Sequence, residues 1–147
     1  MKKHCPHVSL KHFLGPDMTH RLLAFAQERR NDFVPGRITT RTNAKIDTST
    51  YVALNIHNLG ELGEEVAARL REMAPDLATA LGMPIFEVHD ITVSMAAYGD
   101  GHFYKPHTDV NIAKMAIGRP IRAITACYYF VTVHSPPVDQ AVAGMAL

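Results

Sequence analysis

A change in hydrophobic pattern near Pro84 is the feature that most constrains the fold of this chain. Before Pro84, apolar residues recur at intervals of three and four over 59–73, with Glu and Arg between them, which indicates an amphipathic helix. After Pro84 the sequence is rich in β-branched and aromatic residues, above all in 121–133 (IRAITACYYFVTV). Helices first and strands later favour an α+β fold with helices packed on an antiparallel sheet.

Proline and glycine predict where the helices begin and end. The segment 15–17 (Gly-Pro-Asp) begins a first helix, because Pro suits the first turn and Asp the positive end of the helix dipole. This helix is expected to end within 28–31. Pro75 is predicted to break the second helix, with a further turn or two that ends at Gly82.

Short strands and turns are predicted for the rest of the chain. The segment 33–42 is expected to be a loop followed by a short strand, and 85–95 a strand. A turn is predicted at 99–101 (Gly-Asp-Gly). We expect 103–109 to be extended, since Pro106 disfavours helical backbone at the residue before it.

Composition narrows the class of protein. The 147 residues suffice for one domain with a single core, and the net charge of +1 gives no electrostatic reason to expect nucleic acid or an anionic membrane as partner. Cys5 and Cys127 form neither a disulfide framework nor a Cys-x-x-Cys site, so a reducing, cytoplasmic location is expected. The start MKKHCPHVSLKHFLG lacks the apolar stretch of a signal peptide, and the apolar run 126–133 is too short to span a bilayer.

His107-Thr108-Asp109 is the motif whose residue types point most clearly to a specific chemistry, the binding of a metal ion. Residues i and i+2 of a strand point to the same face, so we expect the imidazole and the carboxylate to project together. They would form two legs of a two-His-one-carboxylate site, which holds Fe(II) and leaves other positions open. With nine His in the chain, the tripeptide alone favours an exposed polar turn over a metal site.

The neighbouring residues extend this motif across two predicted strands. Residues 98–109 read Y-x-x-G-x-F-Y-x-x-H-x-D, and residues 122–129 read R-x-x-T-x-x-x-Y. This pattern resembles the first half of the prolyl-4-hydroxylase-like Fe(II)/2-oxoglutarate dioxygenases, and the match covers 95–130. Many positions agree at fixed spacing, which makes the pattern far more specific than H-x-D. The resemblance implies N-terminal helices packed on an antiparallel double-stranded β-helix, or jelly-roll, sheet.

The resemblance also implies a chemistry and roles for residues. Fe(II) would be bound by His107 and Asp109, 2-oxoglutarate would be the cosubstrate, and ascorbate would keep the iron reduced. A C–H bond of a prolyl residue, or of another protein or small-molecule substrate, would be hydroxylated while 2-oxoglutarate is decarboxylated to succinate. Tyr98 and Tyr129 would hydrogen-bond the cosubstrate, with aromatic core residues as the alternative for both. No catalytic residue beyond the metal ligands is expected.

The family's second half has no counterpart in this sequence. The resemblance implies a second His well beyond Asp109, and an Arg or Lys after it. Neither is found before Leu147, and His134 does not stand where the family has a ligand. Pro136-Pro137 is predicted to stop any strand, so 131–147 is interpreted as a tail foreign to the family.

We therefore expect one partial dioxygenase domain over 1–147, with helices in 1–83 and the first jelly-roll strands in 84–133. Open strand edges would permit self-association. The alternative is a truncated, non-catalytic remnant or interaction module of that family. A hydrolytic zinc site built on His107 and Asp109 is more distant, because no H-E-x-x-H or Cys pair supports it.

Overall fold

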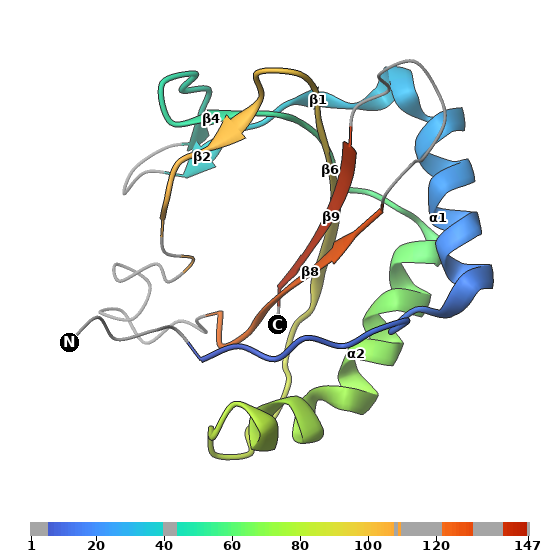
Figure 1. The fold of residues 1–147 in the computed structure, drawn as a ribbon, viewed down its shortest axis with the longest axis vertical. Helices are drawn as coiled ribbons and strands as arrows, with labels where there is room; N and C mark the ends of the chain where they lie inside the picture. The colour runs from blue at the N-terminus through green and yellow to red at the C-terminus, as the bar shows by residue number, and fades with distance from the viewer. Residues whose placement is uncertain (1–5, 40–43, 108, 110–121, 131–139, 147) are drawn as a thin grey trace.

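The computed structural model describes residues 6–39, 44–107, 109, 122–130 and 140–146, the last segment as backbone alone. In these residues the chain forms two α-helices, a short 3-10 helix, and one five-stranded and two two-stranded antiparallel sheets (Figure 1). The α+β class predicted from the sequence is confirmed, whereas closure into a jelly roll stays a prediction. In chain order the elements are α1 (Gly15–Glu28), η1 (Arg30–Asp32), β1 (Val34–Pro35), β2 (Ile38–Thr39), β3 (Ala44–Lys45), β4 (Tyr51–Val52), β5 (Leu54–Ile56), α2 (Glu61–Ala80), β6 (Thr92–Tyr98), β7 (Phe103–Tyr104), β8 (Thr125–Tyr129) and β9 (Gln140–Ala146).

The first helix lies where the sequence predicts it. α1 has Pro16 in its first turn and Asp17 as the acidic residue there, as expected for the start of a helix. Leu22 on its inner side is buried. α1 is fastened to the rest of the chain by the Thr19 hydroxyl, which lies 2.7 Å from the Tyr128 hydroxyl of β8.

The second helix corrects one prediction, because α2 runs through Pro75 without a break. Pro75 is exposed, so water can satisfy the carbonyl that loses its backbone donor. Ala74, Leu77 and Ala78 continue the buried face past the proline, and this packing outweighs the local cost. The helix ends as predicted: Gly82 has a φ of +67°, a conformation that glycine adopts without steric cost.

The main sheet has the strand order β1-β5-β6-β9-β8, and all its pairings are antiparallel. One prediction about it was wrong, because the strand predicted from residue 85 starts only at Thr92, which is the first residue of β6 paired to β9. Pro136-Pro137, where the sequence predicts a strand end, lies outside the described residues. β9 follows it in the sequence and lies between β6 and β8. Antiparallel pairing on both sides keeps this late strand in the sheet.

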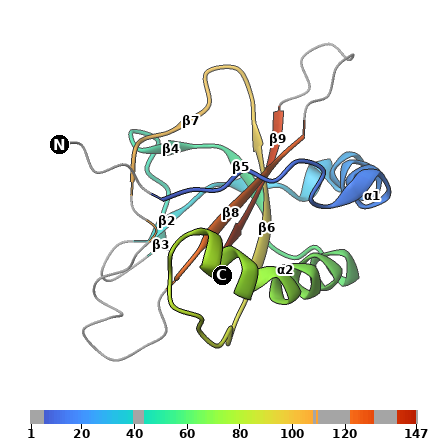
Figure 2. The same cartoon turned by 60° about the horizontal axis from the view of Figure 1, so that its bottom comes forward.

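Both helices lie on the same face of this sheet in two views (Figures 1 and 2). The hydrophobic core fills the space between them, with Met95 of β6 fully buried against residues of α1 and α2. An ion pair between Arg21 and Glu65, with N–O distances of 2.6 and 2.5 Å, links the helices at the surface. Within the part of the chain that the structure describes, no helix is long and apolar enough to cross a membrane. The core members are Leu14, Leu22, Ile56, Leu59, Leu62, Val66, Leu70, Leu77, Met95, Ile124 and Phe130.

Candidate metal centre

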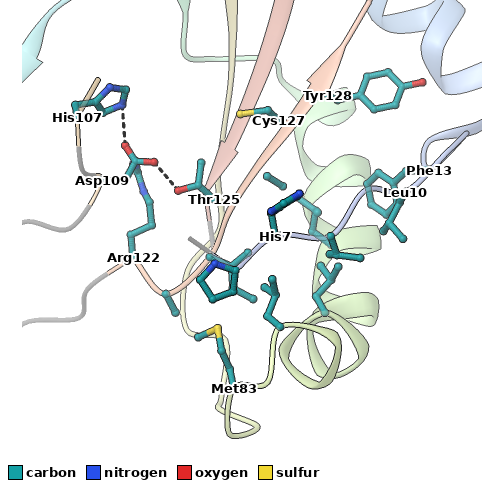
Figure 3. A pocket seen from close by; sticks show the side chains of 18 residues that line it. His7, Leu10, Phe13, Met83, His107, Asp109, Arg122, Thr125, Cys127 and Tyr128 are labelled. Atoms are coloured by element: carbon teal, nitrogen blue, oxygen red, sulfur yellow. Dashed lines mark hydrogen bonds and ion pairs between the residues drawn. The ribbon is translucent and has the colours of Figure 1, made fainter. Parts of the chain in front are cut away.

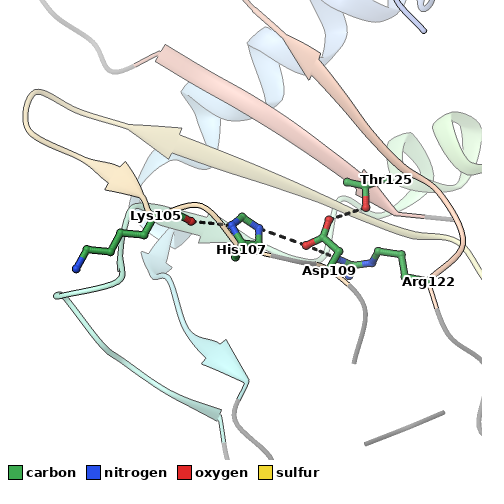
Figure 4. Close-up of polar contacts among 5 residues, drawn as sticks. All are labelled: Lys105, His107, Asp109, Arg122 and Thr125. Carbon is green, nitrogen blue, oxygen red and sulfur yellow. Dashed lines mark hydrogen bonds and ion pairs between the residues drawn. The ribbon is translucent and has the colours of Figure 1, made fainter. Parts of the chain in front are cut away.

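The segment that follows β7 carries the two predicted metal ligands (Figure 4). β7 pairs with β4 over two residues, and the Lys105 amide then donates to the Thr50 carbonyl at 2.9 Å. Pro106 has no N–H to extend the ladder, so neither His107 nor Asp109 lies in a strand. The extended strand predicted over 103–109 is therefore limited to its first two residues, although the two side chains do meet.

The His107 and Asp109 side chains face each other across a short gap. His107 Nε2 lies 3.3 Å from Asp109 Oδ1. His107 Nδ1 lies 2.9 Å from the Lys105 carbonyl, and because a carbonyl only accepts, Nδ1 must carry the proton. This leaves Nε2 directed at the carboxylate, the arrangement that a metal-binding His commonly adopts.

The separation of these two atoms suits two ligands of one ion. Donor atoms that each lie about 2.1 Å from a metal and at right angles are about 3 Å apart. A neutral imidazole lone pair directed at a carboxylate oxygen is repulsive unless a cation or a proton lies between them. The pair therefore fits a metal ion, and it equally fits an imidazolium–carboxylate ion pair.

Asp109 is oriented by two residues of the segment that leads into β8. The Thr125 hydroxyl donates to Asp109 Oδ2 at 2.6 Å, and Arg122 Nη1 lies 3.2 Å from Asp109 Oδ1. Arg122 and Thr125 belong to the R-x-x-T part of the sequence pattern, but no contact of Arg122 with Asp109 was predicted from the sequence. The signal was present in R-x-x-T, since both residues reach the same carboxylate.

An aromatic series connects His107 with Tyr98. The Tyr104 ring stacks on the His107 ring, with centroids 3.6 Å apart and an interplanar angle of 17°. Tyr51 follows at 4.2 Å from Tyr104, and Tyr98 at 6.4 Å from Tyr51. Burial, and secondarily Tyr51, raises the pKa of the Tyr98 hydroxyl above its ordinary value. The Tyr98 hydroxyl therefore stays protonated at physiological pH and can donate a hydrogen bond to the carboxylate of a bound small molecule.

Tyr129 is placed differently from Tyr98. Its side chain is 67% exposed, and β8 puts it on the same face as Thr125 and Cys127. The neighbouring Cys127 thiol, with partial burial, raises the pKa of the Tyr129 hydroxyl. No contact recorded among the described residues joins Tyr129 to His107 or Asp109. Sequence reasoning overlooked Tyr51 and Cys127 here, because neither belongs to the recognised pattern.

A cavity of about 670 Å³ adjoins the two predicted ligands (Figure 3). His107, Asp109 and Arg122 lie to one side of β8, and His7, Leu10 and Phe13 to the other. The wall away from the ligands is mostly apolar. The site thus has a charged end at Asp109 and an apolar end near α2, whose Leu70 and Leu77 also line the cavity.

The described residues offer two ligands rather than three. They contain no group of three or more His, Cys, Asp or Glu side chains placed to hold a metal ion. His134, to which the sequence gave no ligand role, lies outside the described residues.

Comparison with known proteins supports the resemblance read from the sequence. No protein-family model matches the chain. The chain is 28% identical over 121 residues to an uncharacterized PKHD-type hydroxylase of Synechocystis sp.. The alignment covers 82% of this chain and 38% of that protein, so the chain spans less than half the length of its curated relative. The relative confirms the resemblance to the prolyl-4-hydroxylase-like dioxygenases, and the chain is a homologue of a PKHD-type hydroxylase.

Proposed function

We propose that this chain provides part of an Fe(II)- and 2-oxoglutarate-dependent dioxygenase that hydroxylates a C–H bond, with His107 and Asp109 as two of the metal ligands. The observation that carries the proposal is the directed pair itself: Nδ1 is bound to the Lys105 carbonyl, and Nε2 lies 3.3 Å from Asp109 Oδ1. A jelly-roll fold is part of the same proposal, because two-His-one-carboxylate dioxygenases of this resemblance use one.

Each residue around the pair has a defined task in this proposal. His107 supplies a neutral nitrogen and Asp109 a negative charge to hold the ion. Thr125 holds the carboxylate so that Oδ1 faces Nε2. Tyr98 donates a hydrogen bond to a carboxylate of 2-oxoglutarate, and Tyr129 reaches the same cosubstrate from β8. When bound, iron and 2-oxoglutarate supply the activation of O₂, with ascorbate as the external reductant.

The apolar end of the cavity bears on the substrate. Removing water from the space beside a metal protects the reacting groups and strengthens their electrostatic contacts. Leu70 and Leu77 of α2 line the apolar part of the cavity, across β8 from Asp109 (Figure 3). An uncharged group, such as a prolyl ring or an aliphatic side chain, is a better occupant of that apolar part than a charged one.

A second candidate is a non-catalytic member of the same family. It is favoured by Arg122, whose guanidinium lies 3.2 Å from the oxygen that would bind the metal and neutralises its charge. It is also favoured by the two-ligand count within the described residues. In this case His107, Asp109 and Arg122 form an ion-pair cluster that fixes the segments before and after them.

Anaerobic absorbance spectroscopy tests the proposal. Fe(II) and 2-oxoglutarate are added to the purified chain, and a weak visible charge-transfer band is expected from cosubstrate chelated to protein-bound iron. The band should disappear in His107→Ala and persist in the matched control His89→Ala, whose His is exposed and does not line the cavity beside the pair. A folded protein that shows no band would instead support the ion-pair cluster.

A further inference from the structure

Tyr51 stands at the centre of the aromatic series, although no sequence pattern singled it out. β4 and β7 pair so that Tyr51 lies directly opposite Tyr104. Tyr51 is only 7% exposed, whereas Tyr104 on the outer side of the stack is 39% exposed. It is therefore the buried member on which the exposed ring beside His107 rests.

The position of the Tyr51 ring is fixed from two directions. Its hydroxyl donates to Asn55 Oδ1 at 2.8 Å, and Asn55 is itself buried. On the other side the chain passes at Gly36, where an added Cβ would lie 2.2 Å from Tyr51 Cε1. The Gly36 amide donates to the Ala53 carbonyl at 2.8 Å, which holds the glycine in place. Only a residue without a side chain allows this approach.

Two contacts carry the fixed position of Tyr51 into the candidate site. Through Tyr104 it sets the plane against which the His107 imidazole stacks, 3.6 Å away. Its ring also lies beside the Tyr98 ring, with centroids 6.4 Å apart and an interplanar angle of 57°. A residue that touches both ends of the site can determine their relative placement.

We propose that Tyr51 is a positioning residue that orients His107 through Tyr104 and sets the position of the Tyr98 ring packed beside it. The inference deepens the proposed function and rests on it for the ligands named there. Asn55 and Gly36 act with Tyr51, the first as the acceptor for its hydroxyl and the second as the gap that admits its ring. Tyr51 does not itself contact the metal or the cosubstrate.

NMR of the metal-free protein tests the first half of this inference without depending on activity. The imidazole signals of His107, assigned by their loss in His107→Ala, carry the ring-current shift of the stacked Tyr104. In Gly36→Ala the new methyl displaces the Tyr51 ring, so these signals should move toward those of an unstacked imidazole. They should stay in place in Tyr128→Phe, which loses a hydroxyl on the helix-facing side. Unmoved His107 signals in folded Gly36→Ala would overturn the inference.

Tyr51→Phe tests the second half and the part played by Asn55. The ring remains but loses its hydrogen bond to Asn55, so the His107 signals and the Tyr98 ring signals should move in the same direction as in Gly36→Ala, by a smaller amount. Tyr98 ring signals that stay in place in both folded variants would refute the role of Tyr51 beside Tyr98. Absence of any 2-oxoglutarate binding in the unaltered protein would refute the proposed function while both NMR results still decide the role of Tyr51.

Discussion

The two faces of the five-stranded sheet hold different kinds of side chain. On the face toward α1 and α2, Met95 and Ile56 pack into an apolar core. On the other face, the adjacent residues Ala96 and Asn55 are paired, and Asn55 accepts the hydrogen bond of Tyr51. Successive side chains of a strand point to opposite faces of the sheet, so neighbouring residues have different roles. One packs in the hydrophobic core and the next faces the candidate site.

β8 shows the same division most clearly. Tyr128 reaches α1 through the Thr19 hydroxyl, while Thr125 holds the carboxylate of Asp109. The comparison implies that changes on the helix side should alter the free energy of unfolding, and changes on the opposite side the affinity for metal and cosubstrate.

The largest effect on stability is expected from Leu22→Ala. Leu22 is 1% exposed, so its truncation leaves a cavity and should lower the free energy of unfolding by about 2–5 kcal/mol. Urea denaturation measures the change, with Ile85→Ala as control because Ile85 is 73% exposed. Equal losses in the two variants would show that the helix-facing side is not the main source of stability.

Thr125→Val addresses the opposite face. The substitution keeps the shape of the side chain and removes the donor to Asp109 Oδ2. Partners that orient a metal ligand are typically worth about 10–100-fold in metal affinity, and we expect a loss in that range, with the free energy of unfolding changed by less than about 1 kcal/mol. Titration with Co(II) as a spectroscopic substitute for Fe(II) measures it. Thr92→Val, an exposed threonine of β6, is the matched control, and equal affinities in both variants would remove Thr125 from the site.

The ends of α1 and the meeting of His107 with Asp109 could be predicted from the sequence, because Pro16 and the H-x-D spacing act locally. The strand predicted at His107 was wrong, because the β4–β7 pairing ends before Pro106, which has no N–H to continue it. The extended backbone expected there does not by itself show where strand pairing ends. The predicted break at Pro75 was wrong for the opposite reason. Buried contacts of the residues after Pro75 outweigh the local tendency of proline to end a helix.

The contacts of Tyr51 could not be predicted at all. They depend on the approach of Gly36, on the buried Asn55 and on the β4–β7 register, three features from separate parts of the chain. β9 likewise follows a proline pair that signals an end, and it is placed by its pairing with β6 and β8. Such positions are determined by strand pairing between residues that are far apart in the chain, and these pairs cannot be inferred from a single sequence.

The free energy of unfolding is expected to depend on pH in the alkaline range because of the Tyr98 phenol. Burial raises the pKa of Tyr98, so the unfolded chain releases this proton at a lower pH than the folded chain does. The unfolded state then binds fewer protons, and the free energy of unfolding should fall as the pH rises above about 10. Urea denaturation at pH values from about 8 to about 11, a range that includes the ordinary phenol pKa of about 10, measures this fall. Tyr98→Phe should reduce the slope more than Tyr128→Phe does, and equal slopes in the two variants would contradict the assignment to Tyr98.

The smallest effect is expected where the helix side meets solvent, at the ion pair between Arg21 and Glu65. Both side chains are more than two-fifths exposed, so water and salt screen their attraction. The Arg21 hydrogen bond lowers the pKa of the Glu65 carboxyl, so its stabilisation should be present above the ordinary glutamate pKa of about 4.3 and be lost as the pH falls below it. Thermal unfolding of Arg21→Gln at pH 7 should show a small decrease in Tm that disappears at high salt and at pH 3. Arg71→Gln on the exposed side of α2 is the control, and a decrease as large as that of Leu22→Ala would mean that the helices are joined by charge rather than by their apolar core.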